Sequence, residues 1–264
     1  MTAAAGPVSG RFTKDSTTGI VPNPFADDRD IIWLDIDNTL YSASTKIAAA
    51  MGQRIHAYFV TLGLDDDAAS DLHHKYYTQY GLALRGLVRH HEIDPIDFDR
   101  KCDGSLPLEE LLQPDPALRQ LLMDIDRSKV RLWALTNAYK THAERVLNIL
   151  NLRDQMEGVI FCDYSNPEFS CKPEPEYYQN ALKTAGISDP SKCYFIDDSL
   201  SNIKAAKKLG WGRCVHFCEH GLESVEGGKP LVIGKQGAET AEEILAVADL
   251  QELRSVWPEV FKTQ

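Results

Sequence analysis

Two carboxylates stand two residues apart at the end of a strongly apolar segment. They are Asp35 and Asp37 in the stretch Leu34-Asp35-Ile36-Asp37-Asn38-Thr39-Leu40. One interpretation is a solvated turn, since Asp and Asn are common turn residues. In the functional interpretation Asp35 attacks an electrophile, Asp37 transfers protons, and both lie near a divalent cation. A hard cation such as Mg²⁺ takes oxygen ligands, often with substrate phosphate, and it offsets the repulsion between two unpaired acids.

Three further polar clusters follow apolar segments along the chain. Thr136 and Asn137 offer a hydroxyl and an amide that suit an anion such as phosphate, although they could equally cap a helix. Lys172 precedes a proline-initiated helix, and a lone lysine is usually a solvated surface group unless it points at the acids. Asp197 and Asp198 could interact favourably with the positive end of the dipole of the next helix, or they could complete a metal site.

The elements that must position these groups alternate between short apolar segments and helical patterns. The apolar segments predict strands buried on both faces at Ile31–Ile36, Val130–Thr136, Val159–Cys162, Cys193–Ile196 and Cys214–Phe217. Helical patterns lie between the later ones, at Thr141–Leu150, Pro173–Ala185 and Ser199–Leu209. This alternation predicts an α/β fold with a Rossmann-like parallel sheet and helices on both faces. The carboxyl ends of its strands would bring the four clusters into one crevice.

The first strand breaks the alternation, because no convincing strand follows it until Val130. The intervening helical patterns cover Thr45–Leu62, Asp66–Tyr80 and Leu108–Ile125. We expect an all-helical cap, inserted after the first strand, that covers the site. The predicted units are a flexible tail at 1–29, a core at 30–42 and 127–264, and the cap at 43–126.

Composition narrows the classes of partner. The 264 residues include 28 Lys and Arg against 39 Asp and Glu, so the net charge is 28 − 39 = −11. An acidic chain without a basic block is a poor candidate for binding a nucleic acid polymer. We expect no membrane association and no secretory signal, because no apolar run reaches about 18 residues and the N-terminus lacks the signal pattern. The six cysteines lack zinc-site spacing and indicate reduced thiols, so we expect a cytoplasmic protein, with nuclear location left open.

In their order, the four motifs resemble the haloacid dehalogenase-like superfamily, whose members are mainly Mg²⁺-dependent phosphohydrolases. Three further segments resemble the fungal pyrimidine 5′-nucleotidase group, and the resemblance runs from about residue 30 to about 250. Those segments are Tyr76–Leu87, Leu135–Lys140 and Phe161–Ser165.

The resemblance implies a role for each motif residue. Asp35 would be the nucleophile that forms an aspartyl-phosphate. Asp37 would protonate the leaving oxygen and then activate water, with its main-chain carbonyl on the metal. Lys172 would neutralise charge on Asp35 and on the phosphate, and Thr136 and Asn137 would hold the phosphoryl oxygens.

The metal follows from the same resemblance. Mg²⁺ would be held by Asp35, Asp37 and Asp198, with Asp197 as a nearby second acid. Many superfamily members carry another Asp four residues after the metal-binding one, whereas this chain has Asn202 there. The nucleotidase group tends to have Asn at that position, so the departure does not indicate inactivity.

Substrate choice is expected to lie in the cap. Tyr80, Arg85 and His90 are the candidates for binding substrate, because aromatic rings stack on bases and arginine meets polar edges. Tyrosines at helical spacing are more often core residues, and the paired histidines are more often packing or surface groups than metal ligands. The wider set of candidate lining residues also includes Tyr76, Tyr77, Arg89 and His91.

The leading hypothesis is therefore a Mg²⁺-dependent phosphatase acting on nucleoside 5′-monophosphates, preferably UMP and CMP. Nicotinamide mononucleotide, a sugar phosphate or lysophosphatidate are alternative small substrates, and a catalytically idle regulatory protein is an alternative of another class. The small-molecule substrate is the partner that we expect, while the oligomeric state is not predicted. Redox sensitivity through Cys171, beside Lys172, stays open.

Overall fold

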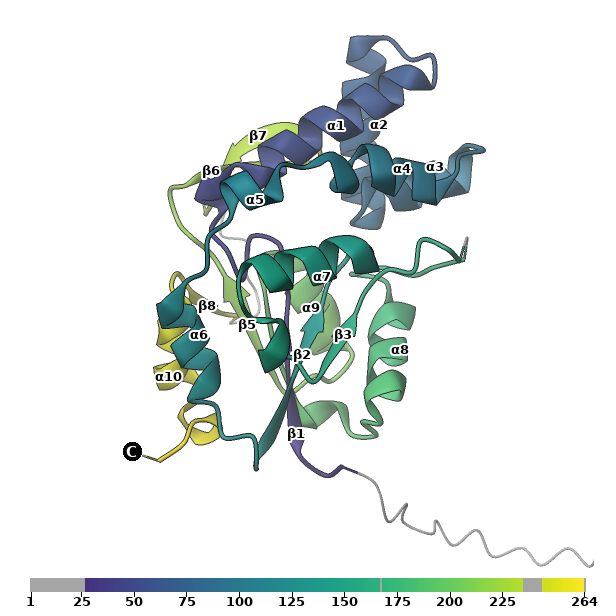
Figure 1. The fold of residues 1–264 in the computed structure, drawn as a ribbon. Helices are drawn as coiled ribbons and strands as arrows, with labels where there is room; N and C mark the ends of the chain where they lie inside the picture. The colour runs from purple at the N-terminus through teal and green to yellow at the C-terminus, as the bar shows by residue number, and fades with distance from the viewer. Residues whose placement is uncertain (1–26, 167, 235–243, 264) are drawn as a thin grey trace, which may run out of the picture.

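The computed structural model describes residues 27–166, 168–234 and 244–263 (Figure 1). The tail predicted at 1–29 therefore lies almost entirely outside the described residues. Its last residue is docked on the core, because the Arg29 guanidinium donates to the Arg127 carbonyl at 2.6 Å and pairs with Glu157. Within the described ranges, no helix combines the length and the apolar composition that crossing a bilayer requires.

A parallel six-stranded sheet forms the centre of the molecule, in the order β3-β2-β1-β4-β5-β8. This confirms the predicted α/β, Rossmann-like fold. Leu34, the last residue of β1, pairs with Ala134 of β2 on one side and Ile196 of β4 on the other. The carboxyl ends of the three central strands therefore lie side by side. The strands are β1 (Asp30–Leu34), β2 (Val130–Leu135), β3 (Gly158–Ile160), β4 (Cys193–Asp197), β5 (Arg213–Phe217) and β8 (Leu245–Val247).

Helices cover both faces of the sheet because β1 is apolar on both sides. Ile32 and Leu34 belong to one core, which also contains residues of α6, α7 and α10. Ile31 and Trp33 belong to the other, which contains residues of α8, α9 and the cap. These helices are α6 (Pro116–Met123), α7 (Lys140–Ile149), α8 (Pro175–Ala185), α9 (Leu200–Lys208) and α10 (Leu253–Val256).

The segment between β1 and β2 rises above the carboxyl ends of the strands as a helical cap (Figure 1). Two of its helices match the prediction closely, whereas α3 and α4 were not predicted. Both are only seven or eight residues long, too short for a clear apolar period. The cap helices are α1 (Ile47–Thr61), α2 (Asp66–Tyr80), α3 (Ala83–His90), α4 (Pro95–Lys101) and α5 (Leu108–Leu111).

The single helix predicted at Leu108–Ile125 is wrong. Two prolines, Pro114 and Pro116, interrupt it, since a proline inside a helix lacks the amide donor and clashes with the preceding turn. The chain forms α5 and then restarts as α6, where Pro116 takes the first turn and Asp115 caps it by accepting from Ala117 N. α6 lies beside the sheet near α10 rather than over its carboxyl ends (Figure 1). The residue limits given for the cap and core units stay a prediction.

A two-stranded hairpin, β6 (Glu223–Glu226) and β7 (Lys229–Val232), was also not predicted. Its strands are only four residues long and half exposed, too short for an alternation of apolar residues to mark them. β6 packs against the cap helix α1, although the hairpin follows the core strand β5 in sequence (Figure 1). The cap is therefore contacted by a core segment as well as by its own two connections.

Gly81 sets how closely the cap approaches the core. It ends α2 with a left-handed backbone, at φ 76°, and its amide donates to Tyr77 O. A Cβ at this position would lie 2.5 Å from the carbonyl oxygen of Lys172 and equally close to Pro173 Cδ. Only glycine combines that backbone with that approach, so the turn between α2 and α3 rests directly on the Lys172 loop.

Candidate active site

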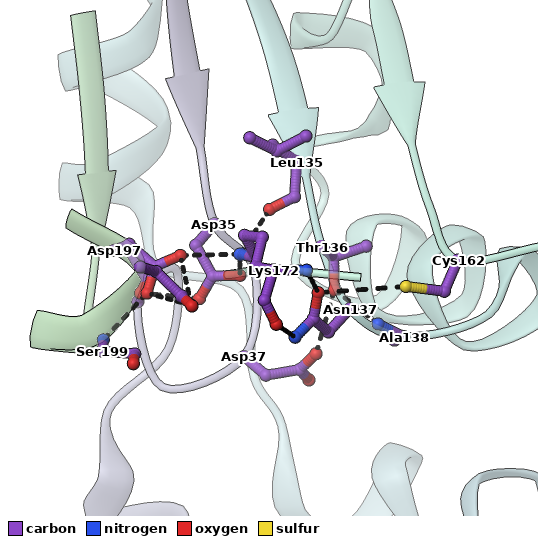
Figure 2. A network of polar contacts seen from close by, with 12 residues as sticks. Asp35, Asp37, Leu135, Thr136, Asn137, Ala138, Cys162, Lys172, Asp197 and Ser199 are labelled. Atoms are coloured by element: carbon purple, nitrogen blue, oxygen red, sulfur yellow. Dashed lines mark hydrogen bonds and ion pairs between the residues drawn. The ribbon is translucent and has the colours of Figure 1, made fainter. Parts of the chain in front are cut away.

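Three carboxylates meet at the carboxyl end of the central strands. Asp35 directly follows β1, while Asp197 ends β4 and Asp198 follows it. Oxygen atoms of these three side chains all lie within 4.8 Å of one another. We call Asp35, Asp197 and Asp198 the acid cluster, part of which is drawn in Figure 2. The parallel sheet produces this convergence, because neighbouring strands end at the same edge.

Lys172 enters the acid cluster from the loop before α8 and is 1% exposed. Its ammonium donates to Asp35 Oδ1 and to Asp197 Oδ2, both at 2.6 Å, and to the carbonyl of Leu135 at 2.7 Å (Figure 2). Burial alone would lower the pKa of Lys172, but the charges of Asp197 and Asp35 overcome this and raise it. The lysine therefore stays charged and is an internal ion-pair partner, not a surface group.

One lysine does not balance three acids, and the electrostatics of the cluster reflect this. Burial, and then the charges of Asp35 and Asp197, raise the pKa of Asp198 well above its usual value. Burial also raises the pKa of Asp35, against the opposing effect of Lys172. A divalent cation would relieve the excess negative charge, and carboxylate oxygens are the ligands that Mg²⁺ prefers. The donor set thus fits Mg²⁺.

Asp37 lies at the side of the acid cluster, with its side chain 32% exposed. Its Oδ1 accepts from the Tyr41 hydroxyl and from Nε2 of His142, each at 2.7 Å. Its Oδ2 has the Thr136 hydroxyl at 3.5 Å. Burial would raise the pKa of Asp37, but the positive charge and hydrogen bond of His142 lower it. One carboxylate oxygen is therefore firmly held and the other is nearly free.

Thr136 and Asn137 differ in what they can offer a phosphoryl group. The Thr136 hydroxyl accepts from Ala138 N at 3.0 Å and lies 3.5 Å from Asp37 Oδ2, so it is close to the proposed proton-transfer group. Both ends of the Asn137 side chain bond the lysine loop: its amide donates to Lys172 O at 2.9 Å and its oxygen accepts from Lys172 N at 2.7 Å (Figure 2). Asn137 thus anchors the lysine loop, and contact with a phosphoryl group through its side chain stays a prediction.

The cap residues predicted to bind substrate have partners of other kinds. The Tyr80 hydroxyl and His90 Nε2 bond each other at 2.7 Å on an exposed face. The Arg85 guanidinium donates to Glu174 at 3.0 Å, two residues beyond Lys172, so it docks the cap on the lysine loop. Substrate contact by Tyr80, Arg85 and His90 stays a prediction.

Tyr77 is the cap residue that the structure ties electrostatically to the acid cluster. Burial, then the charges of Glu226 and Asp198, raise the pKa of its hydroxyl well above the usual value. Tyr77 also packs on the hairpin, because a Cβ on Gly227 would lie 3.0 Å from Tyr77 Cβ. It was one of seven cap residues considered from the sequence.

Sequence reasoning missed two groups, Tyr41 and His142, that hold Asp37. Tyr41 lies four residues after Asp37, on the opposite side of a tight turn. His142 lies in the first turn of α7, six residues after Thr136. A polar side chain in the helix after a strand-end motif is the only local signal, and many surface helices carry one. Asn202 also has a defined role, since its amide donates to Asp197 Oδ1 at 2.9 Å and orients that acid.

Cys171 is fully buried, and its thiol donates to the Tyr80 carbonyl. Burial raises the pKa of this thiol to about 12. Reactive cysteines need a lowered pKa and access to solvent. The surroundings of Cys171 therefore disfavour the redox sensitivity left open from the sequence.

Comparison with known proteins gives consistent matches. A family model described as haloacid dehalogenase-like hydrolase matches residues 30–210. Phosphate metabolism protein 8 of Saccharomyces cerevisiae is 40% identical over 200 residues, which are 72% of this chain and 62% of that protein. The chain thus spans less than two thirds of this relative's length.

Solved structures share the fold at low sequence identity. CbbY of Rhodobacter sphaeroides, in complex with xylulose-1,5-bisphosphate, superposes with a TM-score of 0.57 and 19% identity, covering 85% of this chain and 96% of that one. YfnB of Bacillus subtilis, a HAD-hydrolase bound to magnesium, gives a TM-score of 0.54 and 16% identity, covering 86% and 98%. At such identities these likenesses bear on the fold alone.

Proposed function

The chain belongs to the haloacid dehalogenase-like hydrolase family, as its motifs predicted, and from this premise we propose that it is a Mg²⁺-dependent phosphatase for nucleoside 5′-monophosphates. One observation carries the proposal: buried Lys172 bridges Asp35 and Asp197 while Asp198 has no hydrogen-bonding cation among the described residues. That arrangement leaves negative charge at the acid cluster, where a cation and a phosphoryl group would both be held.

Asp35 is suited to be the nucleophile. Its carboxylate is oriented by Lys172 on Oδ1 and by the Thr39 hydroxyl on Oδ2, at 3.0 Å. Attack on phosphorus forms the bond from Asp35 to phosphorus while the bond to the leaving oxygen breaks, and Asp37 donates its proton to that oxygen. The products of this step are an alcohol and an aspartyl-phosphate. Covalent catalysis divides one difficult displacement into two easier ones.

The second step restores the protein. The Asp37 carboxylate takes a proton from water as the water oxygen attacks phosphorus, and the bond to Asp35 breaks. Inorganic phosphate leaves, Asp35 is again a carboxylate, and Asp37 is again protonated. Lys172 stays paired with Asp35 throughout and offsets the charge of the phosphoryl oxygens.

Asp35 and Asp198, with the main-chain carbonyl of Asp37, would hold Mg²⁺. When bound, the ion supplies charge neutralisation for the phosphoryl group and for the surrounding acids. The proposal is supported by the excess of acids over cationic side chains around this point and by the raised pKa of Asp198.

The pyrimidine preference, for UMP and CMP, rests on the segments that resemble the nucleotidase group. Nicotinamide mononucleotide, a sugar phosphate or lysophosphatidate are the alternative substrates. Tyr77, also considered from the sequence, is a further candidate aromatic group, because the charge of Asp198 acts on its hydroxyl. Tyr80, Arg85 and His90 remain proposed substrate contacts, and substituting each should raise KM for UMP more than it lowers kcat if they bind the base.

The test is phosphate release from UMP, CMP, nicotinamide mononucleotide, glucose 6-phosphate and lysophosphatidate, with and without EDTA. We expect the highest kcat/KM with a pyrimidine nucleotide and loss of activity in EDTA that Mg²⁺ restores. Equal rates in EDTA would contradict the metal requirement, and a higher kcat/KM for another ester would replace the proposed substrate.

The nucleophile has its own test. Asp35→Asn should lose at least about 10³-fold in kcat, because an amide cannot form the acyl-phosphate. Asp71→Asn, at an exposed cap position, is the control that should keep normal turnover. UMP binding by the wild-type protein without phosphate release would instead identify the idle regulatory protein.

A further inference from the structure

A buried histidine lies between Asp37 in the core and an acid of the cap. His142, in α7, is 4% exposed and its Nε2 lies 2.7 Å from Asp37 Oδ1. The other ring nitrogen, Nδ1, lies 3.6 Å from Asp103 Oδ1 and makes no hydrogen bond among the described residues. Asp103 belongs to the short turn Asp103–Ser105 of the cap, which packs against α7. The imidazole thus stands between a core acid and a cap acid.

A second buried cap acid, Asp99, acts electrostatically on the same ring. Asp99, near the end of α4, is 8% exposed and its Oδ1 has no hydrogen-bond partner in the described part of the chain. Its charge and that of Asp103 both act on His142. Two buried acids are costly to keep unless a positive or donating group lies nearby. The buried acids of the cap therefore interact with one core side chain, His142, and that side chain hydrogen-bonds Asp37.

The two carboxylate oxygens of Asp37 differ in the number and length of the hydrogen bonds that they accept. Oδ1 accepts from both Tyr41 and His142, at 2.7 Å each, so its lone pairs are occupied. Among the residues that the structure describes, Oδ2 has only the Thr136 hydroxyl, at 3.5 Å. An acid catalyst needs one oxygen free to carry the proton and a fixed carboxyl plane that points it at the leaving group.

We propose that His142 is a positioning residue for Asp37. With Tyr41 it holds Oδ1, so that Oδ2 is the oxygen that exchanges the proton with the leaving group. The cap acid Asp103, 3.6 Å from Nδ1, keeps the imidazole in that orientation. The inference rests on the proposed phosphatase activity. It makes the protonation step depend on the docked position of the cap, since moving the cap away would remove the acid that holds the ring.

The leaving group distinguishes positioning from a merely structural role. An alcohol leaves only with a proton, whereas p-nitrophenolate leaves without one. Loss of a well-placed acid should therefore harm the hydrolysis of UMP far more than that of p-nitrophenyl phosphate. The ratio kcat/KM is the right measure, because it reports the steps up to release of the leaving group and excludes later hydrolysis of the aspartyl-phosphate.

His142→Leu and His142→Gln form the decisive pair. Leucine fills the site without a donor, while the glutamine amide reaches the place of Nε2 and can donate to Oδ1. We expect His142→Leu to lower kcat/KM for UMP by about 10²-fold and for p-nitrophenyl phosphate by less than about 5-fold. His142→Gln should restore UMP hydrolysis to within about 5-fold of wild type.

Two further variants and a control keep the test decisive if His142→Leu does not fold. Tyr41→Phe removes the second donor to Oδ1, and Asp103→Asn removes the nearer cap charge. Both should lower kcat/KM for UMP by about 10-fold and leave p-nitrophenyl phosphate nearly unchanged. His73→Leu is the matched control, because His73 is another buried histidine, 2% exposed, that lies in the cap against Phe59.

The inference would be overturned if His142→Leu lost equal kcat/KM on UMP and p-nitrophenyl phosphate, or lost none on either. It would also be overturned if His142→Gln were as impaired as His142→Leu. Failure of the proposed substrate looks different. If wild type hydrolyses glucose 6-phosphate but not UMP, the pyrimidine proposal fails and the same comparison is made with glucose 6-phosphate. Wild-type protein inactive on all three esters would refute the phosphatase proposal and this inference together, and activity on p-nitrophenyl phosphate alone would refute the inference.

Discussion

Replacing Lys172 by methionine tests whether the buried ammonium holds the acid cluster together. The lysine is 1% exposed and pairs at 2.6 Å with both Asp35 and Asp197, which are themselves 7% and 0% exposed in their side chains. Methionine keeps most of the apolar stem and removes the charge. Two carboxylates would then be left buried beside each other without their shared cation.

The expected loss of unfolding free energy in Lys172→Met follows from the burial of these charges. Removing one partner of a buried ion pair destabilises a protein by about 3–5 kcal/mol, because the remaining charge stays uncompensated. The control is Lys129→Met, at a half-exposed lysine whose Nζ lies 3.5 Å from Asp126. Loss of such a surface pair should cost less than about 1 kcal/mol.

The assay is urea unfolding in EDTA, so that no divalent cation substitutes for the lysine. The double variant Lys172→Met/Asp197→Asn should be less destabilised than the sum of its single variants by about 1–3 kcal/mol, because neutralising Asp197 removes part of the repulsion. Added Mg²⁺ should stabilise Lys172→Met more than wild type. A loss below about 1 kcal/mol in Lys172→Met, or strict additivity in the double variant, would refute the reasoning.

Two other predictions test the cap contact and the pH dependence of stability. Gly81→Ala should lose at least about 2 kcal/mol of unfolding free energy, because a Cβ would add a clash with the Lys172 carbonyl to the cost of a left-handed backbone. The control Gly63→Ala, at φ 89° with nothing within 4 Å, should lose only about 1–2 kcal/mol in the same measurement. Equal losses in the two variants would contradict the close approach of Gly81 to the Lys172 loop. His142 has its pKa raised to about 9, against burial, by Asp37 and the cap acids. The contribution of charged His142 to stability is therefore full below about pH 6.5 and lost as pH rises through 9. The difference in unfolding free energy between wild type and His142→Gln should fall by up to about 3 kcal/mol from pH 6 to 10. A difference that does not change with pH would show that His142 does not titrate as its contacts with Asp37 and Asp103 indicate.

Much of the core was predictable because its signals are local. Strands buried on both faces read as continuous apolar segments, and β1, β2 and β4 were found for that reason. Each ends in a polar motif, and a parallel sheet brings such ends to one edge. The sequence alone therefore predicts the convergence of Asp35 with Asp198, and the structure places their oxygens within 4.8 Å.

Other elements gave no usable local signal. The β6–β7 hairpin has strands of only four residues, and its strand β6 packs on the cap helix α1. The prediction of one helix at 108–125 took no account of Pro114 and Pro116. The second part, α6, packs beside the sheet because Leu118 and Leu121 are buried in the apolar core there. In both cases tertiary contacts decide what the weak local pattern leaves open.

The chain's own sequence determined which residue types stand at the strand ends, and hence a crevice of acids, a lysine and hydrogen-bonding groups under a helical insert. Only the tertiary structure decided the pairing of Lys172 with both Asp35 and Asp197, the occupation of the Asn137 side chain by the lysine loop, and the link from Asp37 through His142 to the cap. The partners of these contacts lie 25 to 137 residues apart. Hydrogen bonds and ion pairs act over a few ångströms, so their partners are set by how distant segments pack, which no local pattern in a single sequence encodes.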